Sequence, residues 1–329
     1  MNFIIVFSIL IMPIAVFSQE RDSVAVNEYV IFMDEKLSVK FDIDNDIETL
    51  SAFENDIEFK IKPNIDYRAE LSVHYRFVSF KIGYTPHLFT NYDESNKGKT
   101  KIFKLESDFY IKKWIQTFGY SQIKSFYSPD YPLPKEYPTD YLILDQLKIY
   151  NFKGATRYRF NTNYSLKAIT TQTEIQQKST GTFIPGLLYQ FNIIDNKATN
   201  QKLSTINFTL SMGYLHTFVI NKKVFASVGA SPGVGVDFNH LKFYDNTNNY
   251  TETDKGYTLN FDGHLGLGYN SVNWFGGGFY KLKTTTRKES TIVNYDNIRN
   301  HFQLFIGYRF KAPKFLRKEA DWIEEKSPF

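Results

Sequence analysis

The chain alternates apolar and polar side chains over long segments, and this period of two constrains its fold more than any other feature. In residues 298–310 the even positions carry Ile, Asn, Phe, Leu, Ile, Tyr and Phe, and the odd positions carry Arg, His, Gln, Phe, Gly and Arg. Successive side chains of a β-strand point to opposite faces. One face of this segment is therefore apolar and aromatic, whereas a helix would scatter the same residues around its axis. The pattern predicts a β-strand with one apolar face.

Other segments along the chain also read as strands. In residues 66–77 the odd positions are Tyr, Ala, Leu, Val, Tyr and Phe, and the even positions are Asp, Arg, Glu, Ser, His and Arg. Lengths of up to 17 residues exceed the roughly 5–6 residues usual in soluble sheets and match tilted strands that cross a membrane. The complete set of predicted strands is 66–77, 78–90, 99–112, 113–127, 148–160, 164–176, 179–193, 203–219, 223–238, 257–270, 273–286 and 298–310.

Composition indicates a membrane protein built from strands. After Ser18 the sequence contains no stretch of 18 apolar residues, and its mean hydropathy is −0.36. Its 31 Phe, 23 Tyr and 3 Trp make up 17% of the chain, as expected of a barrel with aromatic girdles at both membrane surfaces. Apart from helices, only a closed barrel satisfies every backbone polar group in lipid. We predict an all-β fold, an antiparallel transmembrane β-barrel of about 12 strands, with roughly 10 to 14 as the range.

The first 18 residues are predicted to be a signal peptide. Phe3 to Phe17 form an almost continuous apolar run that is too short to cross a bilayer as a helix. Val16 and Ser18 are small enough for cleavage before Gln19. The n-region has no Lys or Arg, and an uncleaved anchor is the alternative. We predict export to the outer membrane of a Gram-negative bacterium.

Cysteine content and net charge exclude several classes of protein. The chain has no cysteine, so it has no disulfide, no thiolate metal site, no cysteine nucleophile and no lipoprotein anchor. Its formal net charge is only +4, which gives no support to nucleic-acid binding.

The mature chain is predicted to have three parts. Residues 19–60 are interpreted as a periplasmic lead, residues 61–310 as the barrel and residues 311–329 as a C-terminal tail. Lys-Ala-Pro opens the tail, and Pro is favoured at a helix start. A short interfacial helix is expected there, with one face made by Phe315, Leu316, Ala320 and Ile323.

The connections test the strand count. Barrels have short periplasmic turns and long external loops, and in the second half of the chain the two kinds alternate correctly. In the first half the order fails, because the long loop 128–147 falls on the periplasmic side and 161–163 becomes a very short external loop. Either this long loop is a periplasmic or lumen-plugging insertion, or residues 148–176 are miscounted. Three short strands there, with one more at 37–43 or 57–65, would give about 14 strands.

Several short motifs lie near the ends of the predicted strands. They are Lys62-Pro63-Asn64, the run from Asn96 to Lys101, Lys113-Trp114, the run from Tyr158 to Asn161, and the run from Gln176 to Phe183. Together these motifs resemble the Bacteroidetes proteins grouped as domain-of-unknown-function family 4421, over about Leu37 to Phe310. The resemblance implies an outer-membrane barrel and no known reaction.

The inward faces of the predicted strands carry many charges of both signs. In a wide pore such charges select solutes, and in a barrel of about 12 strands they pair across the lumen and close it. Because the signs are mixed, pairing is favoured. The candidate lumen-lining charges are Arg68, Glu70, Arg76, Lys81, Lys104, Glu106, Asp108, Lys112, Arg299, His301 and Arg309.

The aromatic end of the last predicted strand is typical of a signal for barrel-assembly machinery. Tyr308 and Phe310 are its candidate residues, although they lie 19 residues before the C-terminus. We therefore expect this machinery during biogenesis, and outer-membrane lipid thereafter, as partners.

The favoured function is a non-enzymatic outer-membrane barrel that is structural, a narrow channel or a surface-interaction protein, with an unknown ligand. No catalytic, cofactor-binding or metal-binding residue is predicted. One alternative is a membrane-embedded lipid- or lipopolysaccharide-modifying enzyme, which needs a His beside a Ser or Thr at the membrane rim. His216-Thr217 comes nearest in sequence, but His216 shares the apolar face of its strand. The second alternative is a soluble periplasmic β-sandwich binding protein.

Overall fold

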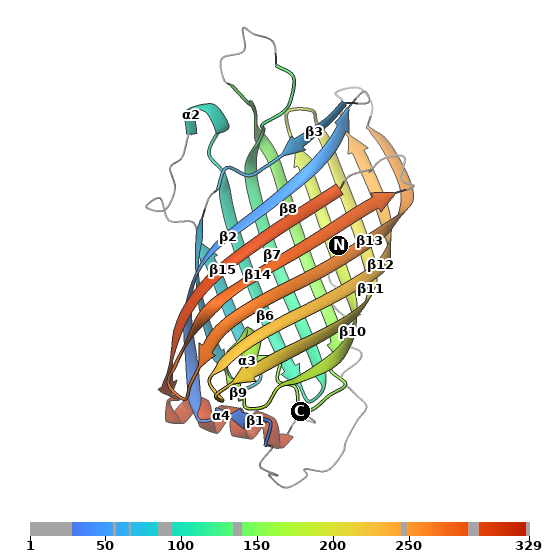
Figure 1. Ribbon diagram of the computed structural model, residues 1–329. Coiled ribbons are helices and arrows are strands. Elements are labelled where there is room, and N and C mark those ends of the chain that lie inside the picture. Colours follow the sequence, from blue (N-terminus) through green and yellow to red (C-terminus); the bar gives the residue numbers. More distant parts are fainter. Residues whose placement is uncertain are drawn as a thin grey trace.

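The chain forms a closed antiparallel barrel of twelve strands (Figure 1). The computed structural model describes residues 28–54, 57–65, 67–84, 94–133, 140–244, 249–288 and 296–326. The wall strands are β2 (Lys36–Glu54), β4 (Arg68–Tyr75), β5 (Val78–Tyr84), β6 (Lys101–Ile111), β7 (Trp114–Ser128), β8 (Leu142–Tyr158), β10 (Thr180–Asn196), β11 (Gln201–Ile220), β12 (Val224–Phe243), β13 (Tyr250–Asn270), β14 (Trp274–Lys288) and β15 (Asp296–Lys311). The elements outside the wall are β1 (Val30–Phe32), β3 (Ile57–Ile61), β9 (Glu174–Gln176), α2 (Glu94–Lys97), α3 (Lys167–Thr170) and α4 (Lys314–Lys326).

The barrel fold and the number of strands are confirmed, but two of the predicted segments were wrong in ways that cancel. β2 pairs with β15 from Lys36 to Leu50 and closes the wall. The barrel therefore begins inside the predicted lead 19–60, and the boundary at residue 61 is wrong. Residues 164–176, predicted as a strand, hold α3 and β9 and do not join the wall.

The same two changes repair the order of the connections. With β2 added and 164–176 removed, β7 ends and β8 begins at the end of the barrel where β14 ends and β15 begins. The loop 128–147, as far as it is described, is therefore external by the loop-length rule. The three-residue external loop at 161–163 does not exist, because these residues belong to a connection at the periplasmic end. The strand β3 at 57–61 pairs with β2 and does not add a thirteenth wall strand.

The outer wall is apolar, as the alternation predicts. On β13 the outward residues Tyr257, Leu259, Leu265, Leu267 and Tyr269 are each at least 43% exposed. Tyr257 and Tyr269 are twelve residues apart, which at about 3.4 Å per residue and a tilt of about 45° separates them by about 29 Å along the barrel axis. The hydrocarbon core of a bilayer is about 30 Å thick, so the two rings lie one at each membrane surface.

An aromatic girdle surrounds the end of the barrel where the short turns lie. Trp274 packs against Tyr308 with ring centroids 4.8 Å apart, and Tyr308 packs against Phe310 at the same distance. Trp114 and Tyr158 form a similar pair at 4.9 Å. Tyr308 and Phe310 thus lie on the lipid-facing side of the last strand. Their role as an assembly signal stays a prediction.

The predicted tail helix is present as α4, at the lower end of the barrel in Figure 1. Ala320 is buried in a cluster with Tyr75 and Ala312, with Leu316 packed against it. Phe315, expected on the same face, is instead 66% exposed. Within the described part of the chain, no helix has the length and apolar character needed to cross a membrane. The predicted signal peptide, residues 1–18, lies outside the described residues.

Candidate functional site in the lumen

The connection between β8 and β10 fills the periplasmic end of the lumen. Residues 159–179 carry α3 and β9, and β9 pairs with β1 through three residue pairs. Tyr164, Ser165 and Gln172 are each 0% exposed. We call residues 159–179 together with β1 the plug. It lies at the lower end of the barrel in Figure 1.

Apolar contacts hold the plug against the wall. Ile169 of the plug is buried in a cluster with Phe225, Phe275, Phe279 and Phe305. The Phe279 and Phe305 rings are stacked with centroids 5.3 Å apart. These inward phenylalanines break the polar pattern of the lumen face, and the plug explains them because it supplies their apolar partner.

Hydrogen bonds attach the plug to the turn between β13 and β14. The buried guanidinium of Arg309 donates to the Gln172 carbonyl and to the Asn270 side-chain oxygen, both at 2.6 Å. Asn270 in turn donates to the carbonyls of Ala168 at 3.3 Å and Glu174 at 3.1 Å. These hydrogen bonds satisfy buried backbone carbonyl groups of the plug. Arg309 therefore connects the last strand to the plug.

The plug also contains a deeply buried phenol. Burial raises the pKa of Tyr164 to about 12, although a hydrogen bond from Thr217 acts in the opposite direction. The nearby Arg159 donates to the Tyr164 carbonyl at 2.6 Å. The plug thus excludes solvent from Tyr164, which is 0% exposed.

A group of ion pairs runs along the inward face of β5, β6 and β8 on one side of the wall. Lys81 lies 2.9 Å from both Glu106 and Asp108, and Lys153 also pairs with Glu106. Thr117 donates to Asp108 at 2.7 Å. Each of these carboxylates has a cation, but the partners lie on neighbouring strands, so these pairs do not span the lumen as the sequence interpretation expected.

A second group of ion pairs involves β2, which the sequence assigned to the lead. Asp44 lies 2.8 Å from Arg68, and Asp42 lies 3.2 Å from Lys40. Gln303 of β15 donates to Asp42 at 2.6 Å. Residues 37–43 were considered as a possible additional strand, but the whole of 19–60 was assigned to a periplasmic lead. In the barrel these carboxylates face inward, where basic residues pair with them.

Two of the predicted lumen charges lie elsewhere. Arg76 and Lys112 occupy two-residue turns with positive φ, 45° and 52°. Arg76 leaves the lumen and contacts α4, where it lies 2.7 Å from Asp321 and 3.0 Å from Glu324. The alternation was extended into turns, where it does not apply. The other candidates share the inward face: Arg68, Glu70, Lys81, Lys104, Glu106, Asp108, Arg299, His301 and Arg309.

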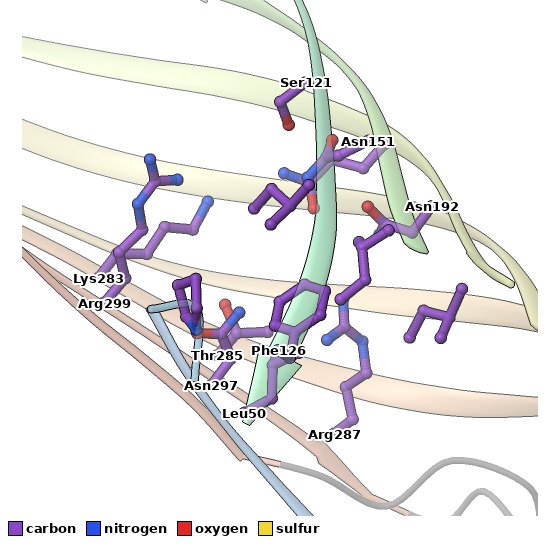
Figure 2. A pocket seen from close by; sticks show the side chains of 15 residues that line it. Leu50, Ser121, Phe126, Asn151, Asn192, Lys283, Thr285, Arg287, Asn297 and Arg299 are labelled. Atoms are coloured by element: carbon purple, nitrogen blue, oxygen red, sulfur yellow. The ribbon is translucent and has the colours of Figure 1, made fainter. Parts of the chain in front are cut away.

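A cavity lies in the external half of the lumen, shown in Figure 2. Three cationic side chains line it: Lys283 and Arg287 from β14, and Arg299 from β15. Lys283 and Arg287 were not among the predicted site residues. The alternation of β14 could have identified them, because Lys283 and Arg287 lie at the same alternate positions as Phe279 and Lys281 and therefore share their inward face.

One histidine has the hydroxyl neighbour that the enzyme alternative requires. His74 Nδ1 lies 2.8 Å from Ser79 Oγ. Both residues are 0% exposed on the inward face. Only the pair Tyr75–Val78 separates them from the turn between β4 and β5 at the periplasmic end, and they face the lumen and not the lipid. His216 instead lies on the outer face, with its ring centroid 4.4 Å from that of Phe218.

Comparisons with known proteins give one family and several solved outer-membrane proteins of low identity. A family model described as a domain of unknown function (DUF4421) matches residues 20–310. No curated protein matches the sequence. The similar solved structures include OmpT of Vibrio cholerae, at 11% identity and a TM-score of 0.35, which covers 85% of this chain and 100% of that one. The outer-membrane protease OmpT from Escherichia coli has 7% identity and a TM-score of 0.39, covering 86% and 100%. An outer-membrane channel from Pseudomonas putida F1 has 10% identity and a TM-score of 0.37, covering 88% and 100%. At these TM-scores the fold assignment rests on the strand register of this chain.

Proposed function

The chain belongs to the family described as a domain of unknown function, DUF4421, and since that description names no activity, we propose a function from the lumen. The protein is a non-enzymatic outer-membrane barrel that opens outward and is blocked toward the periplasm. It works at the cell surface as a structural or ligand-holding protein and does not act as an open channel.

The outer wall supports the membrane location. Its apolar belt has a height close to that of a hydrocarbon core, with aromatic rings at both edges. Lipid is thus the expected partner of the outer face. Export by the predicted signal peptide, recognition of Tyr308 and Phe310 by assembly machinery, and a Bacteroidetes source are part of this proposal.

The plug is the single observation that carries the proposal. Residues 171–176 of the plug are all buried. Elsewhere the barrel is wide enough that Lys281, on its inward face, remains exposed. Side chains alone do not fill a barrel of this width, and an inserted segment does so here.

The burial of the His74–Ser79 pair weighs against the enzyme alternative. Both residues are 0% exposed, so a substrate does not reach them in this arrangement. The nucleophilic arrangement of a lipid-modifying enzyme needs an accessible hydroxyl and an oriented base.

Planar-bilayer recording tests the proposal. The wild-type barrel is expected to show no steady conductance steps. A variant in which residues 163–176 are replaced by a short Gly-Ser linker should conduct, and the linker can span the gap because Phe160 already bonds to Phe183 of β10. The matched control shortens the external loop 129–140 instead, which should leave conductance unchanged. Equal steps from the wild type and the plug-deleted variant would contradict the proposal.

A further inference from the structure

We propose that three lysines on the lipid-facing wall, Lys101, Lys124 and Lys148, bind the phosphate groups of a phosphorylated glycolipid in the outer leaflet of the membrane. This inference rests on the membrane location and orientation proposed above, and it does not depend on whether the lumen is blocked. We call these three residues the lysine triplet.

The strand register places the three lysines side by side. Lys101 of β6 lies directly opposite Lys124 of β7, which in turn lies directly opposite Lys148 of β8. Their side chains point outward, because the adjacent residues Ile123 and Ile149 line the cavity in the lumen. Neighbouring strands are about 4.8 Å apart, so the three positions lie within about 10 Å of one another. Like charges in such positions destabilise a sheet.

Few carboxylates are available to balance this charge. The cross-strand row continues from Lys148 to Asp195 of β10, and then to Lys202 of β11 and Lys242 of β12. Asp195 therefore lies between two lysines, in a row of five lysines and one carboxylate. Among the described residues, no carboxylate lies within 4.0 Å of the ammonium groups of the lysine triplet. An anion from outside the protein would offset the remaining repulsion.

The lysine triplet lies at the outer surface of the membrane. The aromatic pair Trp114 and Tyr158 marks the periplasmic side, and Lys124 and Lys148 lie ten residues further along the same two strands. At about 3.4 Å per residue and a tilt of about 45°, this separation is about 24 Å along the barrel axis. The apolar band of an outer-membrane barrel is about 25 Å tall. Long lysine stems extend toward the polar region, so the ammonium groups reach the level of the headgroups.

An aromatic strip covers the same strands on the periplasmic side of the lysine triplet. The ring centroids of Phe103 and Tyr120 are 6.1 Å apart, those of Tyr120 and Phe152 are 4.8 Å apart, and those of Phe152 and Phe191 are 6.2 Å apart. The three phenylalanines are each at least 37% exposed. A lipid bound here would place its phosphate groups on the lysines and its acyl chains on this strip.

The position and charge of the lysine triplet select the lipid. The outer leaflet of a Gram-negative outer membrane is built largely from phosphorylated glycolipid, whereas glycerophospholipids form the inner leaflet. Clusters of basic side chains at a membrane surface bind anionic headgroups. Each lysine is a compact point charge with three donors, so adjacent lysines suit a headgroup that carries more than one phosphate.

Native mass spectrometry of the full-length folded protein in neutral detergent tests the site, with purified lipid A as the probe. The triple variant Lys101→Gln, Lys124→Gln, Lys148→Gln should lose affinity by about fivefold for each lysine, and on the order of 100-fold in total. The matched control Lys113→Gln, Lys222→Gln, Lys223→Gln removes the same charge from turns at the periplasmic end. It should bind lipid A as the wild type does.

Two further lipids identify the group that is recognised. Dephosphorylated lipid A should bind equally to the wild type and to both variants, and phosphatidylglycerol should bind the wild type more weakly than lipid A does. Equal affinity of the two triple variants for lipid A, or wild-type binding of phosphatidylglycerol as tight as that of lipid A, would overturn the proposal.

Failure of the membrane assignment gives a different result. All three proteins should insert into phosphatidylcholine vesicles, because this lipid offers no net charge to the lysines. If the wild type does not insert, both the membrane location and the lipid site are wrong. If all three insert and the lysine triplet has no effect on lipid A binding, only the lipid site is wrong.

Discussion

The depth of a charge on the outer wall should determine its cost. Leu265 and Tyr257 lie on the same face of β13 and are similarly exposed, at 55% and 59%. The midpoint between Tyr257 and Tyr269 is residue 263, so Leu265 lies about 5 Å from the bilayer centre and Tyr257 about 14 Å. Arginine costs about 2–4 kcal/mol at the midplane of a barrel wall and about 0–1 kcal/mol near the interface. Leu265→Arg should therefore lower the free energy of unfolding by about 2–4 kcal/mol, and Tyr257→Arg by about 0–1 kcal/mol.

Reversible guanidinium unfolding in phospholipid vesicles, followed by tryptophan fluorescence, measures both changes. At about 1.4 kcal/mol per tenfold change, the Leu265 variant should shift the equilibrium constant by roughly 30- to 700-fold. In a water-soluble protein an exposed leucine is replaced at a cost usually within about 0.5 kcal/mol. Equal and small effects at the two positions would refute the lipid-facing belt and favour the soluble alternative.

Two further predictions concern the plug. Arg309→Met should cost about 3–5 kcal/mol in the same unfolding assay, because buried acceptors such as the Gln172 carbonyl lose a charged donor; a loss below about 1 kcal/mol would contradict the attachment. The raised pKa of Tyr164 means that the folded state keeps the phenol protonated, so its contribution is complete below the unfolded pKa near 10 and is lost as pH rises through about 12. The difference in unfolding free energy between wild type and Tyr164→Phe should accordingly decrease over this pH window, and a constant difference would argue against the buried phenol.

The wall of the barrel was predictable because lipid and lumen impose opposite demands on successive residues. This contrast is strongest on β13 and β15, where the alternation continues from one membrane surface to the other. The strand prediction was wrong for residues 164–176, because a segment inside the lumen is buried on both sides and does not need to alternate. The strand count was correct only because the missed β2 replaced this segment.

The sequence predicted that the lumen contains ion pairs, but it did not predict which residues form them. Mixed charges on inward faces indicated ion pairs, but those of Lys81 with Glu106 and Asp108 join neighbouring strands and do not cross the lumen. The partners of Arg68 were missed because Asp44 lies on the strand assigned to the lead. The cross-strand row Asp262, Lys283, Arg299 and Glu48 depends on the registers of β13, β14, β15 and β2, which loop lengths and alternation alone do not determine.

The seam between β2 and β15 imposes an order of events on the biogenesis of this protein. Leu50 meets Asn297 and Lys36 meets Lys311 along the seam, so the wall stays open until nearly the whole chain has been made. Contacts so distant in sequence form late. The plug is enclosed by strands on every side, and it must enter the lumen before the seam closes or pass through the periplasmic mouth afterwards. A chain whose seam closes while the plug stays outside would be an empty barrel, a misassembled species of correct mass and incorrect permeability.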